Sequence, residues 1–265
     1  TIRHLLTHSS GLPGYHQFFL DDQISTKEDV LDYILNVKLN SEPGSHYEYS
    51  DLGFILLTSI IEKVANRSID RLAHSYFFGP LGMHYTRYNP PLEWRRKVAP
   101  TEIDSIYRNR LIHGEVHDEN THLMGGVSGH AGVFSTAKEI ARYAQMLVDG
   151  GIWEGRRILK KSQIQEFTKV QHIPQDSDLA LGWDTPSQSG KSIAGDYFTP
   201  GSFGHLGFTG TSLWIDPNKE IIIVLLTNRV HPSRKGDEGS KEMYGIRRSF
   251  YNAVMEQIIV GDSDN

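Results

Sequence analysis

Apolar residues recur at helical spacing through most of the first 180 residues of the chain. In "DLGFILLTSIIEKVAN" this spacing predicts an amphipathic helix that begins near Ser50 or Asp51. Its apolar stripe consists of Leu52, Ile55, Leu56, Ser59, Ile60 and Val64. The same pattern predicts helices in "TIRHLLTH", in "SIDRLAHSYF", over residues 136–149 and in "KKSQIQEFTK". We expect Gly11 and Pro13 to end the first of these.

The pattern changes after residue 180. Three segments, "ALGWDT", "GHLGFTGTSLWID" and "EIIIVLLTNRV", have the composition of strands, and "DPNKE" between the last two predicts a tight turn. The tail "MYGIRRSFYNAVMEQIIV" returns to the pattern of an amphipathic helix. We therefore predict an α/β (α+β) fold, with a mostly helical lobe over 1–180 and antiparallel strands with a covering helix over 181–265. Three strands make a thin sheet, so we expect its leading strands to lie upstream.

Composition narrows the class of protein. A chain of 265 residues with 38% hydrophobic residues can bury a full core, in one large domain or in two lobes. The formal net charge of -5 gives no basic surface for nucleic acid, and we expect no such partner. The longest apolar run, residues 221–226, has the length of a buried strand and is too short to span a membrane. The chain has no cysteine, which excludes disulfides and thiolate metal sites.

The only Ser-x-x-Lys in the chain is Ser135-Thr136-Ala137-Lys138. One large class of serine hydrolases uses this tetrad to pair its nucleophile with an activating lysine. Here Lys138 lies about 170° around the helix axis from the apolar stripe, on the solvent side, whereas a catalytic lysine must be buried beside its serine. Thr136 and Glu139 also fit a capping box. We therefore interpret Ser135 as part of a helix start and not as a nucleophile.

Five segments carry a family resemblance. They are "TIRHLLTHSSGLPG", "HYEYSDLGFILL", "GPLGM", "GVFSTAKEIARYAQML" and "GSFGHLGFTGTSLWIDP". Together they resemble the serine β-lactamase and penicillin-binding-protein superfamily, in the family's order and over essentially the whole chain, and most closely its class C-like branch of D,D-peptidases and esterases. "GEVHDEN" and "GGVSGHAG" resemble a penicillin-binding-protein 4B-type subgroup. The resemblance implies a β-lactamase/transpeptidase-like fold, with an antiparallel sheet flanked by helices and a mostly helical lobe.

The resemblance also implies where the nucleophile lies. The family works with three elements: Ser-x-x-Lys, Tyr-x-Asn and Lys/His-Thr/Ser-Gly. The first lies upstream of the segment that "TIRHLLTHSSGL" matches, which would place it before Thr1. The sequence starts at Thr1 without an initiator Met or an export signal. We therefore expect a piece of a longer chain that is inactive alone, with the nucleophile supplied upstream or by a separate fragment.

Two residues match the second element. Tyr49 stands for the family's tyrosine, which implies that its phenol accepts the serine's proton and returns a proton to the leaving group. Asp51 stands in place of the family's Asn as a substrate-binding residue. An ionised carboxylate accepts hydrogen bonds but cannot donate one to a substrate carbonyl, and it repels an anionic substrate. The alternative role for Asp51 is that of a helix N-cap.

The third element matches His205-Leu206-Gly207. By resemblance, His205 attracts a substrate carboxylate, an attraction that weakens as pH rises and histidine loses its charge. Gly207 lets substrate approach the strand closely, and the N–H of Phe208 donates to the oxyanion. Leu206 lacks the family's hydroxyl. Together with Asp51, this departure disfavours high β-lactamase activity and leaves esterase or weak carboxypeptidase activity open. His130 either matches a segment that walls the site in relatives or is a loop histidine in a Gly-rich turn.

The resemblance implies a serine hydrolase that forms an acyl-enzyme on an amide or ester bond. Its substrate would be a small molecule or peptide with a carboxylate or an ester, such as a D-Ala-D-Ala peptide or a β-lactam. No metal or organic cofactor is implied. The expected location is outside the cytoplasmic membrane, in the periplasm or at the cell surface.

Two other hypotheses stay open. A non-catalytic member of the same superfamily, with a binding or regulatory role, would also lack the nucleophile. A metal hydrolase is the second, because "HGEVHDENTH" clusters residue types that bind zinc. These residues are His113, Glu115, His117, Asp118 and His122. Gly114 and the polar surroundings disfavour the helix that would align two of the histidines.

Overall fold

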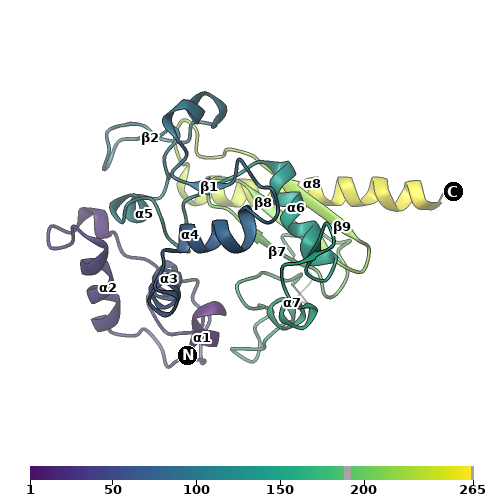
Figure 1. Ribbon diagram of the computed structural model, residues 1–265, viewed down its shortest axis with the longest axis horizontal. Helices are drawn as coiled ribbons and strands as arrows, with labels where there is room; N and C mark the ends of the chain where they lie inside the picture. Colours follow the sequence, from purple (N-terminus) through teal and green to yellow (C-terminus); the bar gives the residue numbers. More distant parts are fainter. Residues whose placement is uncertain (188–191, 264–265) are drawn as a thin grey trace. The chain divides into compact units, whose positions relative to one another are not determined.

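The computed structural model describes residues 1–187 and 192–263 and is shown in Figure 1. It divides into two compact units, each of which is described by itself. Unit 1 comprises Thr1–Tyr143, His172–Ser177 and His231–Ser233, and unit 2 comprises Ala144–Gln171, Asp178–Val230 and Arg234–Asn265. The lobe boundary expected at residue 180 was placed where the composition of the chain changes. The division into compact units does not test such a boundary, so it stays a prediction.

Unit 1 is built mainly from short helices joined by loops. Its helices are α1 (Ile2–Leu6), α2 (Lys27–Asn36), α3 (Asp51–Ala65), α4 (Ile69–Ala73) and α5 (Glu119–Leu123), with 3-10 helices at Phe18–Leu20 and Leu92–Lys97 and a π-helical turn at His74–Phe78. Its strands form two antiparallel pairs, β1 (Arg87–Tyr88) with β4 (Val133–Phe134) and β2 (Ile103–Asp104) with β3 (Arg110–Leu111). Helix α6 (Ala137–Val148) begins in unit 1 and ends in unit 2.

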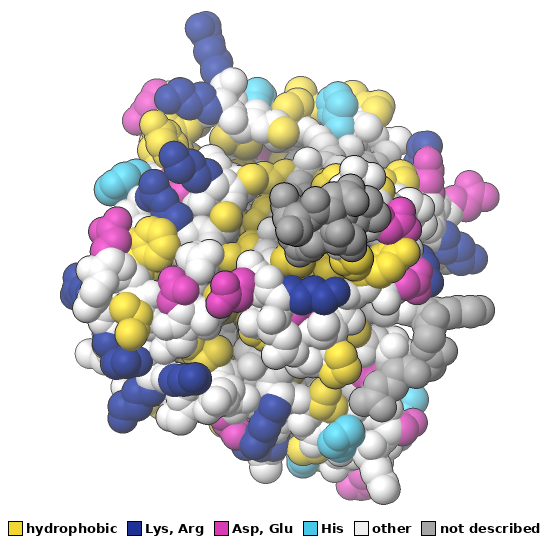
Figure 2. All heavy atoms as spheres, turned by 90° about the vertical axis from the view of Figure 1, so that its right-hand side faces the viewer, with side chains coloured by type: hydrophobic (Ala, Val, Ile, Leu, Met, Phe, Trp, Pro, Cys, Tyr) yellow, Lys and Arg dark blue, Asp and Glu magenta, His cyan; other side chains and the backbone are white. Residues whose placement is uncertain are grey.

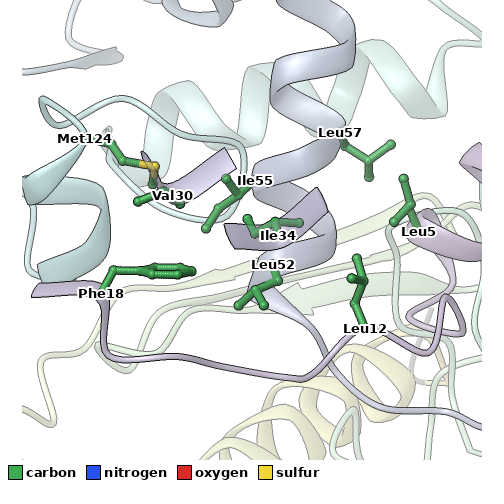
Figure 3. Packing of buried hydrophobic residues seen from close by; sticks show 9 residues of the cluster. All are labelled: Leu5, Leu12, Phe18, Val30, Ile34, Leu52, Ile55, Leu57 and Met124. Carbon is green, nitrogen blue, oxygen red and sulfur yellow. The ribbon is translucent and has the colours of Figure 1, made fainter. Parts of the chain in front are cut away.

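Helix α3 lies at the centre of the core of unit 1. It begins at Asp51, as predicted, because Ser50 is its N-cap and the Ser50 Oγ accepts a hydrogen bond from Gly53 N at 3.1 Å. Figure 3 shows the core cluster, to which α1, α2, α3 and the loops between them contribute. Its buried members are Leu5, Leu12, Phe18, Val30, Ile34, Leu52, Ile55, Leu57 and Met124. The start of α3 is thereby fixed by its cap and by the core together.

The apolar stripe predicted for α3 packs against the core as far as Ile60 but not at Val64. The buried residues of α3 all lie between residues 52 and 58. Leu57, which is outside the predicted stripe, is only 6% exposed, whereas Val64 is 84% exposed. Periodicity shows which residues share a face of a helix, but it does not show how far along the helix the core extends.

The first helix ends earlier than predicted. Helix α1 stops at Leu6 with Thr7 as its C-cap, and His8 then takes a left-handed conformation with φ of 50°. Gly11, expected as the cap, lies in a later turn with φ of 80°. A side chain on Gly11 would overlap the backbone carbonyl of Ser41, so this glycine serves a close approach of two loops and not the end of the helix.

Unit 2 contains the one three-stranded sheet in the described ranges. Its strands are β7 (Phe203–Leu206), β8 (Ser212–Asp216) and β9 (Ile221–Leu225), all antiparallel in the order β7-β8-β9. The other elements are β5 (Ile152–Trp153), β6 (Arg156–Arg157), α7 (Lys161–Thr168) and α8 (Gly236–Ser263). In the register of the sheet, His205 lies opposite Leu213, and Trp214 lies opposite Ile223.

Two of the strand-region predictions have different outcomes. The turn "DPNKE" is confirmed, because the Asp216 carboxylate accepts hydrogen bonds from Asn218 N at 3.0 Å and from Lys219 N at 3.1 Å. The segment "ALGWDT" was expected as a strand, but it contributes only a single bridge, in which Asp184 pairs with Gly204. The composition of this segment therefore correctly indicated that it lies beside the sheet, but only one of its residues pairs with a strand.

The predicted covering helix is confirmed in α8. Tyr251 and Met255 of this helix are fully buried, and they pack in one cluster with Trp214 of β8 and Ile223 of β9. The Tyr251 hydroxyl also forms a hydrogen bond with the Ser212 hydroxyl at the start of β8. Apolar burial and one buried polar contact together join α8 to the sheet.

Charged side chains of both signs lie on the face shown in Figure 2, where Lys and Arg are interspersed among Asp and Glu. This distribution agrees with the modest formal net charge of -5. Within residues 1–187 and 192–263, no helix combines the length and the hydropathy that crossing a bilayer requires.

Gly204 on β7 provides a test of the sheet packing. A Cβ added there would lie 2.5 Å from Cδ2 of Trp214, whose side chain is buried. We expect Gly204→Ala to lower the free energy of unfolding of unit 2 by about 2 kcal/mol, because the core would be overpacked. Urea unfolding followed by tryptophan fluorescence measures this change.

Gly245→Ala is the matched control for that experiment. Gly245 lies on the exposed side of α8, and a Cβ added there meets nothing within 4 Å. Replacing a helical glycine by alanine should raise the free energy of unfolding by about 0.5–1 kcal/mol. The same sign of effect in both variants would contradict this account of the packing at β7.

Candidate active site

Tyr49 lies just before α3 on a backbone held by the segment that follows α1. Asp51 N donates a hydrogen bond to Gly14 O at 2.9 Å. Tyr49 is 48% exposed, and its ring stacks on the imidazole of His8 with centroids 4.2 Å apart. The phenol is thus presented at the surface of unit 1 while one face of its ring is covered.

Asp51 is not the N-cap of α3, because Ser50 has that role. The N-cap alternative for Asp51 is therefore wrong, and Asp51 lies in the first turn of α3. Burial raises the pKa of the Asp51 carboxyl and the charge of Asp118 raises it further, while the charge of His130 opposes both. A carboxyl with a raised pKa keeps its proton to higher pH, and in that form it donates a hydrogen bond as the amide of an Asn would.

His130 is the centre of a buried polar network, and its side chain is only 3% exposed. Its Nδ1 lies 2.8 Å from Ser128 Oγ, and its Nε2 lies 3.0 Å from Asp118 Oδ1 and 3.1 Å from Thr121 Oγ1. Burial lowers the pKa of His130, but the hydrogen bond and charge of Asp118 more than offset this, and the pKa is raised. His130 therefore lies in the Gly-rich loop with its side chain buried, where it forms an ion pair with Asp118.

Asp118 completes this network from the start of α5. Burial disfavours its charged form, but its hydrogen bond with His130 prevails and lowers the pKa of Asp118 to about 2. Its Oδ1 also accepts a hydrogen bond from Thr121 N at 2.6 Å, as the N-cap of α5. From the sequence, Asp118 was expected only in a possible metal cluster, although Asp is also a favoured N-cap residue.

In the possible metal cluster, His122 contacts Glu115, while His113, His117 and Asp118 have partners outside the cluster. The contacts are His117 with Glu102 at 2.9 Å, His113 with Val98 O at 2.8 Å, Glu115 with Arg110, His122 with Glu115 at 3.7 Å, and Asp118 with His130 at 3.0 Å. Among the residues that the structure describes, no group of three or more His, Cys, Asp or Glu side chains is arranged to hold a metal ion. The clustering in the sequence therefore does not become a ligand set in space.

In unit 2, His205 lies on β7 beside a carboxyl that the sequence analysis did not single out. The backbone of Asp184 exchanges two hydrogen bonds with Gly204, both at 2.9 Å, which places Asp184 next to β7. Burial raises the pKa of the Asp184 carboxyl, and the charge of His205 opposes this rise. Little in the sequence indicated that Asp184 lies near His205, because the composition of its segment suggested only a strand.

Gly207 begins the turn from β7 to β8. Its N–H donates to Thr211 O at 2.8 Å, and a side chain at this position would overlap the Thr211 hydroxyl. The buried guanidinium of Arg247 donates from Nη2 to Gly207 O at 2.8 Å and to Thr211 O at 2.7 Å. The turn itself thus requires glycine, and α8 holds both of its ends.

Phe208 follows in the same turn, with its side chain 56% exposed. The guanidinium of Arg229 lies over its ring at 4.4 Å, and Arg229 Nε donates to Phe208 O at 2.6 Å. Because the peptide unit is planar and trans, the hydrogen bond from Arg247 to Gly207 O also fixes the direction of the Phe208 N–H. Arg229 and Arg247 were not predicted from the sequence, since nothing in the local pattern distinguishes them from surface arginines.

The chain thus combines helices with an antiparallel sheet that α8 covers. Solved structures share this fold. A β-lactamase from Mycobacterium bovis matches with a TM-score of 0.62 at 20% identity, covering 97% of this chain and 74% of that chain. A penicillin-binding protein homologue from Pyrococcus abyssi, an octamer, matches with a TM-score of 0.61 at 23% identity, covering 86% and 51%. EstCE1, a hydrolase with promiscuous acyltransferase activity, matches with a TM-score of 0.66 at 21% identity, covering 95% and 71%. The predicted β-lactamase/transpeptidase-like fold is confirmed.

Sequence comparison identifies the family. The family model described as Beta-lactamase matches residues 1–243. Two relatives named "Putative D-alanyl-D-alanine carboxypeptidase" are each 32% identical, one from Salmonella enteritidis over 86% of this chain and one from Escherichia coli over 97%. The chain spans 56% and 64% of the length of these two relatives. It belongs to the Beta-lactamase family, and the predicted resemblance is confirmed.

The Asp118–His130 pair predicts a pH window for the stability of unit 1. The raised pKa of His130 contributes stability below its ordinary value of 6.5, which is lost as pH rises through the folded value. The lowered pKa of Asp118 contributes stability above its ordinary value of 3.8, which is lost as pH falls through about 2. We expect Asp118→Asn to lower the free energy of unfolding by about 2 kcal/mol between about pH 4 and 6.5, and by less at pH 9.

Urea unfolding at pH 5.5 and at pH 9 measures this difference. Asp22→Asn provides the control, because Asp22 is an exposed loop residue of the same unit and its substitution should change stability by less than about 0.5 kcal/mol at either pH. An Asp118→Asn effect of the same size at both pH values would show that the charge on His130 does not contribute.

Proposed function

We propose that this chain is the larger part of a serine acyl-transfer hydrolase of D-alanyl-D-alanine carboxypeptidase or β-lactamase-related esterase type. Membership in the Beta-lactamase family carries this proposal. Its support within the chain is the order of motifs: Tyr49-Ser50-Asp51 enters α3, and His205-Leu206-Gly207 ends β7. The names of the relatives and of EstCE1 support acyl transfer from amides or esters.

In the proposed reaction, a serine hydroxyl attacks the carbonyl carbon of the substrate and forms an ester bond to it. The lysine of the Ser-x-x-Lys element is proposed to lie near Tyr49, where its positive charge favours the deprotonated phenol. The Tyr49 phenolate then takes the proton of the serine. The N–H of Phe208 donates to the oxyanion of the tetrahedral intermediate. When this intermediate collapses, the bond to the leaving group breaks and Tyr49 returns the proton to that group. Water then attacks the acyl-enzyme, which releases the acid and restores the serine.

The serine and its lysine are proposed to lie in a segment that precedes Thr1. The chain spans 64% of the length of the Escherichia coli relative, which leaves room for such a segment. Ser135 is not proposed as the nucleophile, because its Oγ lies 2.6 Å from Thr86 Oγ1, which in turn donates to the buried Glu139 carboxylate at 2.6 Å. Lys138 is exposed, whereas a catalytic lysine must be buried beside its serine.

We propose a substrate with a carboxylate or an ester near the scissile bond, whose acid group His205 attracts. By the family resemblance, Gly207 is proposed to lie against the substrate, and Asp51 and His130 are proposed as substrate-binding or site-wall residues. Leu206 in place of a hydroxyl residue favours esters and peptides over β-lactams. No cofactor takes part in this scheme. A substrate ending in D-alanine would place the protein outside the cytoplasmic membrane.

A nucleophile-free binding protein of the same family is the second candidate. It is favoured by one observation: the only Ser-x-x-Lys in the 265 residues is Ser135-Thr136-Ala137-Lys138, whose serine is bonded to Thr86. Fluorescent penicillin separates the two candidates. Covalent labelling of the full-length protein supports the hydrolase, and reversible binding without labelling supports the binding protein.

Tyr49→Phe tests the proposed proton carrier. Removing the hydroxyl leaves the stacked ring but no group to move protons, so we expect kcat to fall by about 10²–10⁴-fold with the fold intact by circular dichroism. Hydrolysis of a chromogenic ester by the full-length protein measures it. Tyr47→Phe is the matched control, since Tyr47 is 43% exposed and also contacts His8; it should keep kcat within about 2-fold. Equal losses in the two variants would remove Tyr49 from the mechanism.

Ser135→Ala tests the interpretation of the Ser-x-x-Lys segment. The variant loses the contact with Thr86 but leaves the hydrogen bond of Thr86 to Glu139 in place. We expect the free energy of unfolding to fall by about 1 kcal/mol and ester hydrolysis to stay within about 2-fold of the parent protein. A folded Ser135→Ala protein without activity would establish Ser135 as the nucleophile and refute this account.

A further inference from the structure

His8 contacts both the ring of Tyr49 and the backbone that follows it. It is 6% exposed, and its ring stacks on Tyr49 with centroids 4.2 Å apart and planes at 27°. The His8 ring also stacks on Phe54 of α3, with centroids 4.9 Å apart and planes at 26°. The His8 Nδ1 accepts a hydrogen bond from Ser50 N at 2.9 Å. A single buried side chain therefore fixes the surroundings of Tyr49 from within.

The backbone around Tyr49 is held by the same segment. Glu48 N donates to His8 O at 2.9 Å, and Ser50 Oγ donates to Pro13 O at 2.7 Å. In return, Gly14 N donates to the Glu48 carboxylate at 2.7 Å. These bonds lie on both sides of Tyr49 and leave the side-chain torsions as its main freedom. The stacked ring of His8 restricts those torsions.

Position 8 imposes three requirements that histidine meets together. The backbone is left-handed, with φ of 50°, a conformation in which His, Asn and Asp are enriched among residues other than glycine. An acceptor is needed for the N–H of Ser50, so the Nδ1 carries no proton and the neutral ring is protonated at Nε2. A flat ring is needed to stack between Tyr49 and Phe54. Asn would supply the acceptor without the ring, and Phe the ring without the acceptor.

We propose that His8 is a positioning residue for acyl transfer, which holds the Tyr49 phenol at the angle at which it takes the serine's proton. This inference rests on the proposed role of Tyr49 and adds a residue that acts only through it. Reaction rates are sensitive to such positioning, because a misplacement of about 1 Å can reduce the rate by about 10²-fold. A stacked neighbour that prevents rotation of the phenol is therefore expected to act on kcat.

His8→Asn isolates the stacking, because it keeps the acceptor for Ser50 N and tolerates the left-handed backbone. In the full-length protein with a chromogenic ester, we expect kcat to fall by about 10-fold, with KM changed by less than about 2-fold. His16→Asn is the matched control. His16 stacks on Tyr33 at 4.4 Å and 27° in the same unit, and losing that pair should leave kcat within about 2-fold.

The double variant His8→Asn/Tyr49→Phe decides whether His8 acts through Tyr49. If it does, His8→Asn causes no further loss of kcat once the phenol is absent. A further 10-fold loss in the double variant would overturn the proposal, since His8 would then act by another route. An unchanged kcat in His8→Asn alone would also overturn it.

A second measurement does not depend on activity. Ring protons of Tyr49, assigned by their absence in Tyr49→Phe, should resonate upfield in the parent protein because they lie over the imidazole. In His8→Asn they should move towards the positions of an exposed tyrosine, while the Tyr33 signals stay in place. Unchanged Tyr49 signals would refute the positioning role even if the full-length protein hydrolyses no ester, so this failure is distinct from failure of the proposed function.

Discussion

The candidate site of unit 1 depends on the hydrogen bonds between two segments about forty residues apart, residues 8–14 and 48–51. Buried backbone groups must find partners, and here the loop after α1 supplies them for the start of α3. The bonds from Glu48 N to His8 O and from Asp51 N to Gly14 O, both 2.9 Å, mark the two ends of this contact. Leu5, Leu12 and Leu52 of the same elements lie in the core. Tyr49 is therefore placed by the core itself and not by a separate flexible loop.

Each unit also places a carboxyl of raised pKa next to a histidine. Burial is the first cause for both Asp51 and Asp184, and the opposing charge is that of His130 in one case and of His205 in the other. A raised pKa means that the carboxyl loses its proton at a higher pH than an exposed Asp does. In its protonated form a carboxyl can donate a hydrogen bond, as an amide can.

Local sequence signals predicted the parts of the fold that depend on local chemistry. The start of α3 near Ser50 or Asp51 followed from the apolar periodicity, although the cap is Ser50 and not Asp51, and the turn before β9 followed from Asp216 and its neighbours. The end of α1 was wrong, because the left-handed residue is His8 and not Gly11, and a contact with a distant segment determines that choice. Helix α2 was not predicted, although Thr26 and Asp29 form its capping box.

The candidate site was predictable only as far as motifs reach. Tyr49, Asp51 and His205 came from the resemblance, and their roles remain predictions. Their neighbours could not be found in the sequence, because burial and charge depend on the fold: Asp184 is close to His205 only through the bridge to Gly204. The zinc-cluster hypothesis was wrong for the same reason, because His113 and His117 are close in the sequence but contact different partners in the fold.

Arg247 connects the last helix to the chemistry of the sheet. Its guanidinium holds Gly207 O and Thr211 O from α8, so the amide beyond Gly207 is aligned by a residue about forty positions later in the chain. The C-terminal helix is thus a scaffold for the turn as well as a cover for the sheet. A change that displaces Arg247, even one made far along α8 from the sheet, will therefore alter the geometry of that amide.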